Sequence, residues 1–165
     1  MRSPTPKYSY HKWRNDHGGA LVEFAIVMPL LLLIVGGIIE FGLLYYNKQV
    51  ITNASREGAR AATSYRTNNN GDRIKYDATE IADIVESYCK YINDNGDTKY
   101  KLISFGGTRL PTTAVTDPAT IDYPEDLTVV VTFEHHFLFS SFLNLFGADF
   151  GPTLEISATT VMRME

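Results

Sequence analysis

The feature that most constrains this chain is an apolar run close to its N-terminus. From Phe24 to Tyr46 the run has 23 residues, and besides its two terminal tyrosines the only ionisable group is Glu40. A helix of that length spans about 34 Å, which is enough to cross a bilayer with some tilt. The sequence therefore predicts one transmembrane helix, residues 24–46, that anchors the chain in lipid.

The charges before and after this run differ. Residues 1–18 hold four basic residues and one acid, whereas the remainder holds 11 basic and 18 acidic residues and carries a net charge of −7. Basic residues before a span predict a cytoplasmic N-terminus and a C-terminal domain outside the membrane. Lys48, Arg56 and Arg60 follow the span and reduce the asymmetry. An acidic outer domain argues against a nucleic-acid partner.

Cys89 is the only cysteine of the 165 residues. The chain therefore has no intramolecular disulfide and no cysteine-rich zinc site. A lone thiol in an exported domain is either buried in the core or paired with another chain, and the sequence leaves both open.

The N-terminus does not read as an ordinary secretory signal. Its apolar run is longer than the 7–15 residues typical of such signals, and no Ala-x-Ala site follows closely. Small residues instead precede the run at Gly18 and Gly19. A cut after Gly18 would make Gly19 the new N-terminus and place Glu23 at position five. Residues 1–18 are then a cytoplasmic leader that is removed.

Helical patterns occupy two stretches. The first begins near Ala20, passes Pro29, which should bend or loosen its first turns, and turns amphipathic before ending near Ser64. Residues 66–72 read as a loop. A second helix, capped by Asp77 or Thr79, has one apolar face and is ended by residues 93–96.

Strand patterns follow. Residues 99–105 alternate, residues 106–124 read as a long connection, and 127–139 and 153–164 are β-branched strands separated by a turn or short helix at 140–146. We expect these two strands to pair antiparallel and to pack on the outer half of the first helix. The fold class is α+β, with leader 1–18, N-terminal helix 19–64 and exported globular domain 65–165. We find no internal repeat.

Four ordered pieces of sequence resemble one family. They are Gly18-Gly19-Ala20-Leu21-Val22-Glu23-Phe24, the proline-containing Ala25–Leu31, Ile39-Glu40-Phe41-Gly42, and Ala54-Ser55-Arg56-Glu57-Gly58-Ala59-Arg60-Ala61-Ala62. Together they resemble the N-terminal segment of TadE-like proteins, the minor pseudopilins of tight-adherence (Flp-type, type IVc) pilus systems. The final strand, residues 156–163, looks like the end of such chains, and the middle carries no family signature.

The resemblance implies a subunit of a pilus assembly system rather than an enzyme. Prepilin peptidase would cut between Gly18 and Gly19, and the mature chain would help to initiate or prime assembly of a pilus used in adhesion. The implied partners are other pilin or pseudopilin subunits, including a similar minor pseudopilin, the inner-membrane assembly platform, and lipid. The chain would reside in the bacterial inner membrane and could enter the pilus.

The resemblance also implies a role for Glu23. An acid is costly in hydrocarbon, by about 2.5–3.5 kcal/mol at the centre of a span and less near the interface. The expectation is that cleavage exposes the Gly19 amine, which pairs with Glu23 of a neighbouring subunit or of the same chain.

Other residues of the first helix are candidates for helix interfaces. Pro29 can bend the span, and Glu40 can either pair between helices or extend its carboxylate to the interface. Arg56, Glu57 and Arg60 allow a Glu57–Arg60 pair on one solvated face. They could equally mark a contact between subunits, with Gly58 allowing helices to approach closely.

Catalytic chemistry finds little support. Glu134-His135-His136 is the one cluster of candidate side chains, and adjacent residues on a strand point to opposite faces, so the two histidines make a poor chelate. There is no nucleophile elbow, no phosphate-binding glycine loop and no metal-ligand spacing. We therefore predict no enzyme, no cofactor and no metal. The alternative to a pseudopilin is an uncleaved single-pass anchor with an exported protein-interaction domain.

Overall fold

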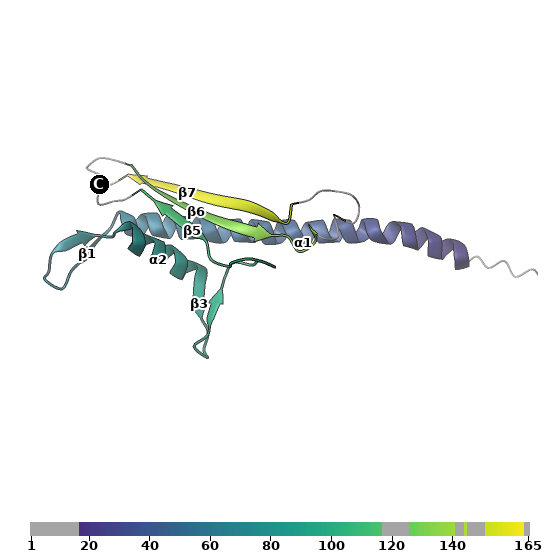
Figure 1. Cartoon of the computed structure of the whole chain (residues 1–165), viewed down its shortest axis with the longest axis horizontal. Helices are drawn as coiled ribbons and strands as arrows, with labels where there is room; N and C mark the ends of the chain where they lie inside the picture. The colour runs from purple at the N-terminus through teal and green to yellow at the C-terminus, as the bar shows by residue number, and fades with distance from the viewer. Residues whose placement is uncertain (1–16, 117–125, 141–143, 145–150, 164–165) are drawn as a thin grey trace, which may run out of the picture. The chain divides into compact units, whose positions relative to one another are not determined.

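The computed structural model describes residues 17–116, 126–140, 144 and 151–163. It confirms the α+β class, with a long N-terminal apolar helix, a second helix and small antiparallel sheets (Figure 1). The chain divides into two compact units, Met1–Gly37 and Ile38–Glu165. The elements, in chain order, are α1 (His17–Ala62), β1 (Tyr65–Thr67), β2 (Arg73–Lys75), α2 (Ala78–Cys89), β3 (Lys90–Ile92), β4 (Thr98–Tyr100), β5 (Thr112–Val115), β6 (Asp126–His136) and β7 (Thr153–Arg163).

Helix α1 contributes to both units. It runs without a break from His17 to Ala62 and includes Pro29, so its observed bounds lie within three residues of the expected Ala20 and Ser64. In the first unit its large apolar side chains from Leu21 to Val35 are exposed. Among the described residues this is the one helix long and apolar enough to cross a membrane, with a mean hydropathy of 2.6 over its most apolar stretch. Such a helix fits a membrane-anchored protein.

The largest sheet has the order β5-β6-β7, and both pairs of strands are antiparallel. Strand β6 pairs with β7 over its full length, from Asp126 opposite Arg163 to His136 opposite Thr153. Alternate residues of β6 are buried, as the period of a strand requires: Leu127, Val129, Val131, Phe133 and His135. The two predicted strands and their antiparallel pairing are confirmed.

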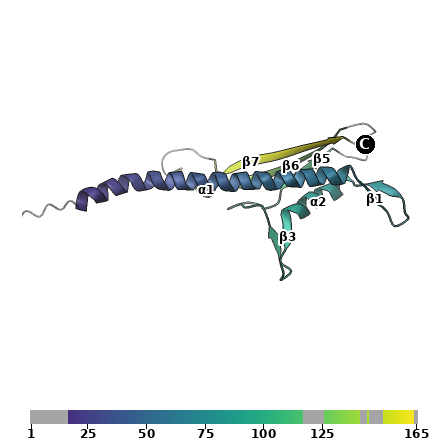
Figure 2. The ribbon, with the colours of Figure 1, turned by 180° about the vertical axis from the view of Figure 1, so that it is seen from behind.

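The second unit has one hydrophobic core. Figures 1 and 2 show β6 and β7 running alongside the part of α1 that belongs to this unit. From α1 the core takes Val50, Ile51, Ala54, Ala59 and Ala62, from α2 Ile81, Val85 and Cys89, and from the sheet the buried face of β6 with Ile156 and Ala158. The predicted packing of the strands on the outer half of the first helix is therefore confirmed.

Helix α2 begins with a capping box. The Asp77 carboxylate accepts a hydrogen bond from the Glu80 amide, and the Glu80 carboxylate accepts one from the Asp77 amide. These bonds satisfy amides that the first turn of a helix leaves without partners. Asp77, and not Thr79, is the cap. The predicted end at residues 93–96 is wrong, because the helix ends at Cys89 and Lys90 already adopts an extended conformation.

Residues 93–97 instead form the turn of a short hairpin, β3–β4, and residues 68–72 form the same turn in β1–β2. Both turns have the sequence Asn-x-Asn-Gly-Asp. In each, the first asparagine Oδ1 accepts from two amides, and the glycine has positive φ, +89° at Gly71 and +83° at Gly96. The predicted loop at 66–72 is thus partly strand, and the chain does contain one short local repeat.

Two further predictions need correction between α2 and β6. The strand expected at 99–105 is limited to β4, because the chain then turns inward to bury Leu102. The long connection expected at 106–124 contains β5, which pairs with β6. Residues 117–125 lie outside the described residues. So does most of the turn or short helix expected at 140–146, of which Ser140 and Asn144 are described and are helical.

Cys89 is fully buried in the core, and burial raises the pKa of its thiol to about 11. A raised thiol pKa means that this group stabilises the fold below the unfolded-state value of about 9 and that its contribution disappears as the pH rises through 11. We expect the native thiol to resist alkylation by iodoacetamide at pH 8 and to react once the chain is unfolded in guanidinium. Equal reaction rates in the two states would contradict the burial.

Candidate functional site

The residues expected at the cleavage site lie in the first turns of α1. Gly18, Gly19 and Glu23 are all exposed, and a Cβ placed on either glycine would meet no atom within 4 Å. Among the described residues the Glu23 carboxylate has no hydrogen-bond or ion-pair partner. Within the described part of the first unit, residues 17–37, Glu23 is the only acid, and it lies unpaired on an otherwise apolar helix surface. Residues 1–16 of the expected leader lie outside the described residues.

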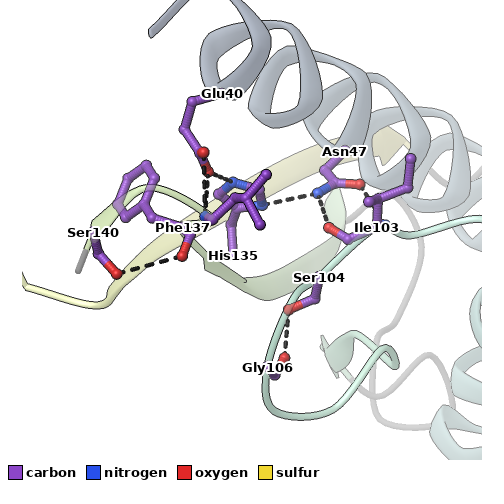
Figure 3. A network of polar contacts seen from close by, with 9 residues as sticks. Glu40, Asn47, Ile103, Ser104, Gly106, His135, Phe137 and Ser140 are labelled. Carbon is purple, nitrogen blue, oxygen red and sulfur yellow. Dashed lines mark hydrogen bonds and ion pairs between the residues drawn. The ribbon is translucent and has the colours of Figure 1, made fainter. Parts of the chain in front are cut away.

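A buried polar network occupies the second unit, where α1 meets the end of β6 (Figure 3). Its three side chains are Glu40 and Asn47 from α1 and His135 from β6, and their exposed fractions are 8%, 0% and 0%. Glu40 and Asn47 are seven residues apart, close to two helical turns, so they share one face of α1. His135 is the last buried position of the alternating pattern of β6. We call these three side chains the polar network.

Hydrogen bonds fix the orientation of each group in the polar network. The Ile103 amide donates to Asn47 Oδ1 at 2.9 Å, and Asn47 Nδ2 donates to the Ile103 carbonyl at 2.7 Å. The second hydrogen of Asn47 Nδ2 points to His135 Nδ1 at 3.0 Å, which must accept it. His135 therefore carries a proton on Nε2 and donates it to Glu40 Oε1 at 3.2 Å.

Glu40 has a second donor. The amide of Leu138, just after β6, donates to both of its carboxylate oxygens, at 3.1 and 3.2 Å. The acid thus ties α1 to the chain that leaves the sheet. We expected Glu40 either to pair between helices or to extend to the interface. In the structure it is instead directed inward and bonded within its own chain.

His136 does not join the network. It points to the other face of β6 and packs against Gly106 and Gly107, where an added Cβ would lie 2.9 Å from Nδ1 and 2.3 Å from Nε2. The expectation that the two histidines face opposite ways is confirmed. Within the described residues no group of three or more histidine, cysteine, aspartate or glutamate side chains could hold a metal ion.

The outer part of α1 carries the remaining candidates. Arg60 donates to Glu57 through Nε at 3.0 Å and Nη2 at 2.5 Å, and this pair lowers the pKa of Glu57 and raises that of Arg60. Arg56 and Arg60 are exposed, as a solvated face requires. Gly58 is buried, and a Cβ there would lie 2.6 Å from Val85 Cγ2. The close approach that Gly58 allows is thus made by α2 of the same chain.

Sequence reasoning missed Asn47 and His135 as members of one network. Asn47 lies beside the aromatic end of the apolar run. It is buried by Ile103 and His135, which are distant in the sequence. A partial signal existed in the spacing of seven residues from Glu40, which repeats along the buried stripe of α1. Asn47 and His135 are 88 positions apart in the sequence, so no local pattern indicates their contact.

These features define a class: a protein with a long apolar N-terminal helix that suits a membrane anchor, and with a globular unit that packs on the C-terminal half of the same helix. Residues 18–60 match the family model described as TadE-like protein. The match confirms the resemblance drawn from the sequence motifs and links the chain to tight-adherence pilus systems, in which this family has a structural role. No curated protein and no solved structure matches the chain.

Proposed function

We propose that the chain is a minor pseudopilin of a tight-adherence type IV pilus system that helps to initiate or prime pilus assembly. The observation that carries the proposal is the position of the family match, which begins at Gly18 and covers α1 as far as Arg60. It includes the expected cleavage site, the acid at mature position five and the apolar helix. A subunit that must leave lipid for a filament needs these three parts together.

Cleavage by prepilin peptidase between Gly18 and Gly19 gives the mature chain. It creates a new amine four residues before Glu23, on the same exposed end of α1. An ion pair between this amine and Glu23 of a neighbour reduces the cost of keeping an acid in an apolar environment. Within the described residues Glu23 has no partner, which supports this role, because the partner is then supplied by processing and assembly.

The mature chain acts in the inner membrane with its C-terminal unit outside. Its partners are prepilin peptidase, pilin or pseudopilin subunits that include a similar minor pseudopilin, and the inner-membrane assembly platform. The exposed apolar side chains of the first unit suit both lipid and the helices of such subunits. Entry into the pilus itself belongs to the same proposal.

The N-terminal residue of the chain tests the proposal directly. The protein is recovered from membranes of cells with and without prepilin peptidase, and its first residue is determined by mass spectrometry of the intact chain and its N-terminal peptide. We expect Gly19 only where the peptidase is present. A chain that keeps Arg2 to Gly18 in both strains would identify an uncleaved anchor with an exported protein-interaction domain.

Glu23→Ala should leave the chain cleaved and in the membrane but strongly reduce its recovery with other pilus subunits. The reason is that the Gly19 amine loses its acidic partner while the apolar surface is kept. Val22→Ala is the matched control, because it changes an exposed neighbour without altering charge. Co-purification from crosslinked membranes measures the effect, and normal recovery of the Glu23→Ala chain would exclude the ion pair.

A further inference from the structure

The part of α1 from residue 38 to residue 47 has two different sides. On one side Glu40 and Asn47 are buried and Leu44 packs against the core. On the other side Ile38, Phe41 and Tyr45 are 69%, 75% and 67% exposed. The sequence assigns most of this stretch to the bilayer interior. The structure places the globular unit against one side of this stretch, so lipid can contact only the other side.

Polar groups limit how far the hydrocarbon can reach here. The outer face of the sheet carries Glu134 and Glu155, which are both exposed and lie directly opposite each other. They are one register position from the pair His135–Leu154, and His135 contacts Glu40 and Asn47. Hydrocarbon surrounding α1 as far as Tyr46 would therefore also surround two carboxylates, which an apolar medium strongly disfavours.

A span that ends earlier avoids this conflict. Leu21 to Ile39 are 19 residues with Glu23 as the only ionisable group. As a helix they measure about 28 Å, close to the thickness of a bilayer's hydrocarbon core. Glu40 then stands at the outer boundary, where its carboxylate is turned away from lipid by His135 and the Leu138 amide.

Exposed apolar side chains lie at this boundary on the globular unit as well as on the helix. Leu138 follows β6 and is 44% exposed, and Leu154, opposite His135, is 43% exposed. Phe41 and Tyr45 lie at the same level of α1 as the polar network. Tyrosine at such a position is typical of the membrane–water interface, where its ring lies at the level of the headgroups.

We infer that the hydrocarbon ends near Ile39 and that the membrane-proximal end of the globular unit, at Leu138 and Leu154, rests in the outer headgroup layer together with Phe41 and Tyr45. The occupant of this surface is the phospholipid interface, because Leu138 and Leu154 lie beside Glu40 and His135, at the level of α1 where the 19-residue span ends. The inference depends only on anchoring of α1 in a membrane. It holds whether or not the chain is cleaved at Gly18.

Spin labels on introduced cysteines test the inference in the full chain. Ile34→Cys, Tyr45→Cys, Leu138→Cys and Thr159→Cys are each labelled with a nitroxide, with buried Cys89 kept and the unaltered chain as the labelling control. The chains are placed in nanodiscs of phosphatidylethanolamine and phosphatidylglycerol, in separate preparations with one chain and with two chains per disc. Collision with oxygen, which concentrates in lipid, is compared with collision with a water-soluble nickel chelate. Circular dichroism confirms that each variant keeps its fold.

We expect the label at 34 to collide mainly with oxygen and the label at 159, on the exposed face of β7, mainly with the nickel chelate. Labels at 45 and 138 should lie between them, with a clear loss of nickel accessibility relative to position 159. A label at 45 as oxygen-dominated as that at 34 would extend the hydrocarbon to Tyr46 and overturn the inference. So would a label at 138 as nickel-accessible as that at 159. Shelter of position 138 only in discs with two chains would identify a second copy as the occupant instead of lipid.

Discussion

Glu40→Ala should lower the free energy of unfolding of the full chain by about 3 kcal/mol. The substitution removes the acceptor of two donors, His135 Nε2–H and the Leu138 amide. His135 is fully buried, so its donor cannot recover the bond by turning to bulk water. A buried donor without an acceptor costs more free energy than a typical hydrogen bond contributes. We therefore expect a large loss of stability when Glu40 is truncated. Denaturant unfolding in a mild detergent, followed by circular dichroism, measures the change.

Two controls separate the polar network from a general effect of removing a charge. Glu57→Ala breaks the exposed pair with Arg60 on the same helix and should change stability by less than about 1 kcal/mol. Glu40→Gln keeps one carbonyl oxygen as an acceptor and should fall between the wild type and Glu40→Ala. If Glu40→Ala were no more destabilising than Glu57→Ala, the polar network would contribute nothing to the fold.

The long elements of this fold could be predicted from sequence because each carries many repeats of its own pattern. The apolar run of α1 has no strand alternative at its length, and 11 residues of alternation in β6 bury one full face. Strand β7 follows the same rule, with Ile156 and Ala158 buried. The antiparallel pairing and the packing on α1 follow from these patterns, because α1, β6 and β7 carry the large apolar faces that must be buried.

The short elements could not be predicted in this way. Strands β1 to β4 have three residues each, too few for an alternation to appear. Their hairpins are set by the turns, where an asparagine side chain holds two amides and a glycine adopts positive φ. The sequence predicts a loop at one Asn-Gly and a helix end at the other, because this dipeptide occurs in both kinds of structure.

The polar network shows a second limit, that of long-range contacts. An acid within an apolar run can face lipid, another helix or its own domain, and local sequence does not distinguish these. The choice at Glu40 is made by His135, which lies 95 residues away. The same holds for Gly58, whose small size reads equally as a contact between subunits and as a contact within the chain. Only the position of α2 decides it.

Gly58→Val should destabilise the globular unit by about 3 kcal/mol. A Cβ at this position would already lie 2.6 Å from Val85 Cγ2 and 3.5 Å from the side chains of Ile81 and Val129. The γ-methyl groups of valine add volume where α1 and α2 are already in close contact. Helix α2 must therefore shift away from α1, which loosens the packing of the core. The same unfolding measurement in detergent reports the loss.

Gly42→Val is the matched control on the same helix, because a Cβ there meets no atom within 4 Å. It should leave stability unchanged to within about 0.5 kcal/mol, since valine forms helices at least as well as glycine. Val85→Ala in the Gly58→Val chain removes the nearest clashing methyl and should restore part of the lost stability, although it is destabilising alone. Equal effects of valine at 58 and 42 would mean that α2 does not pack on α1 at Gly58, and the core assigned to the second unit would have to be redrawn.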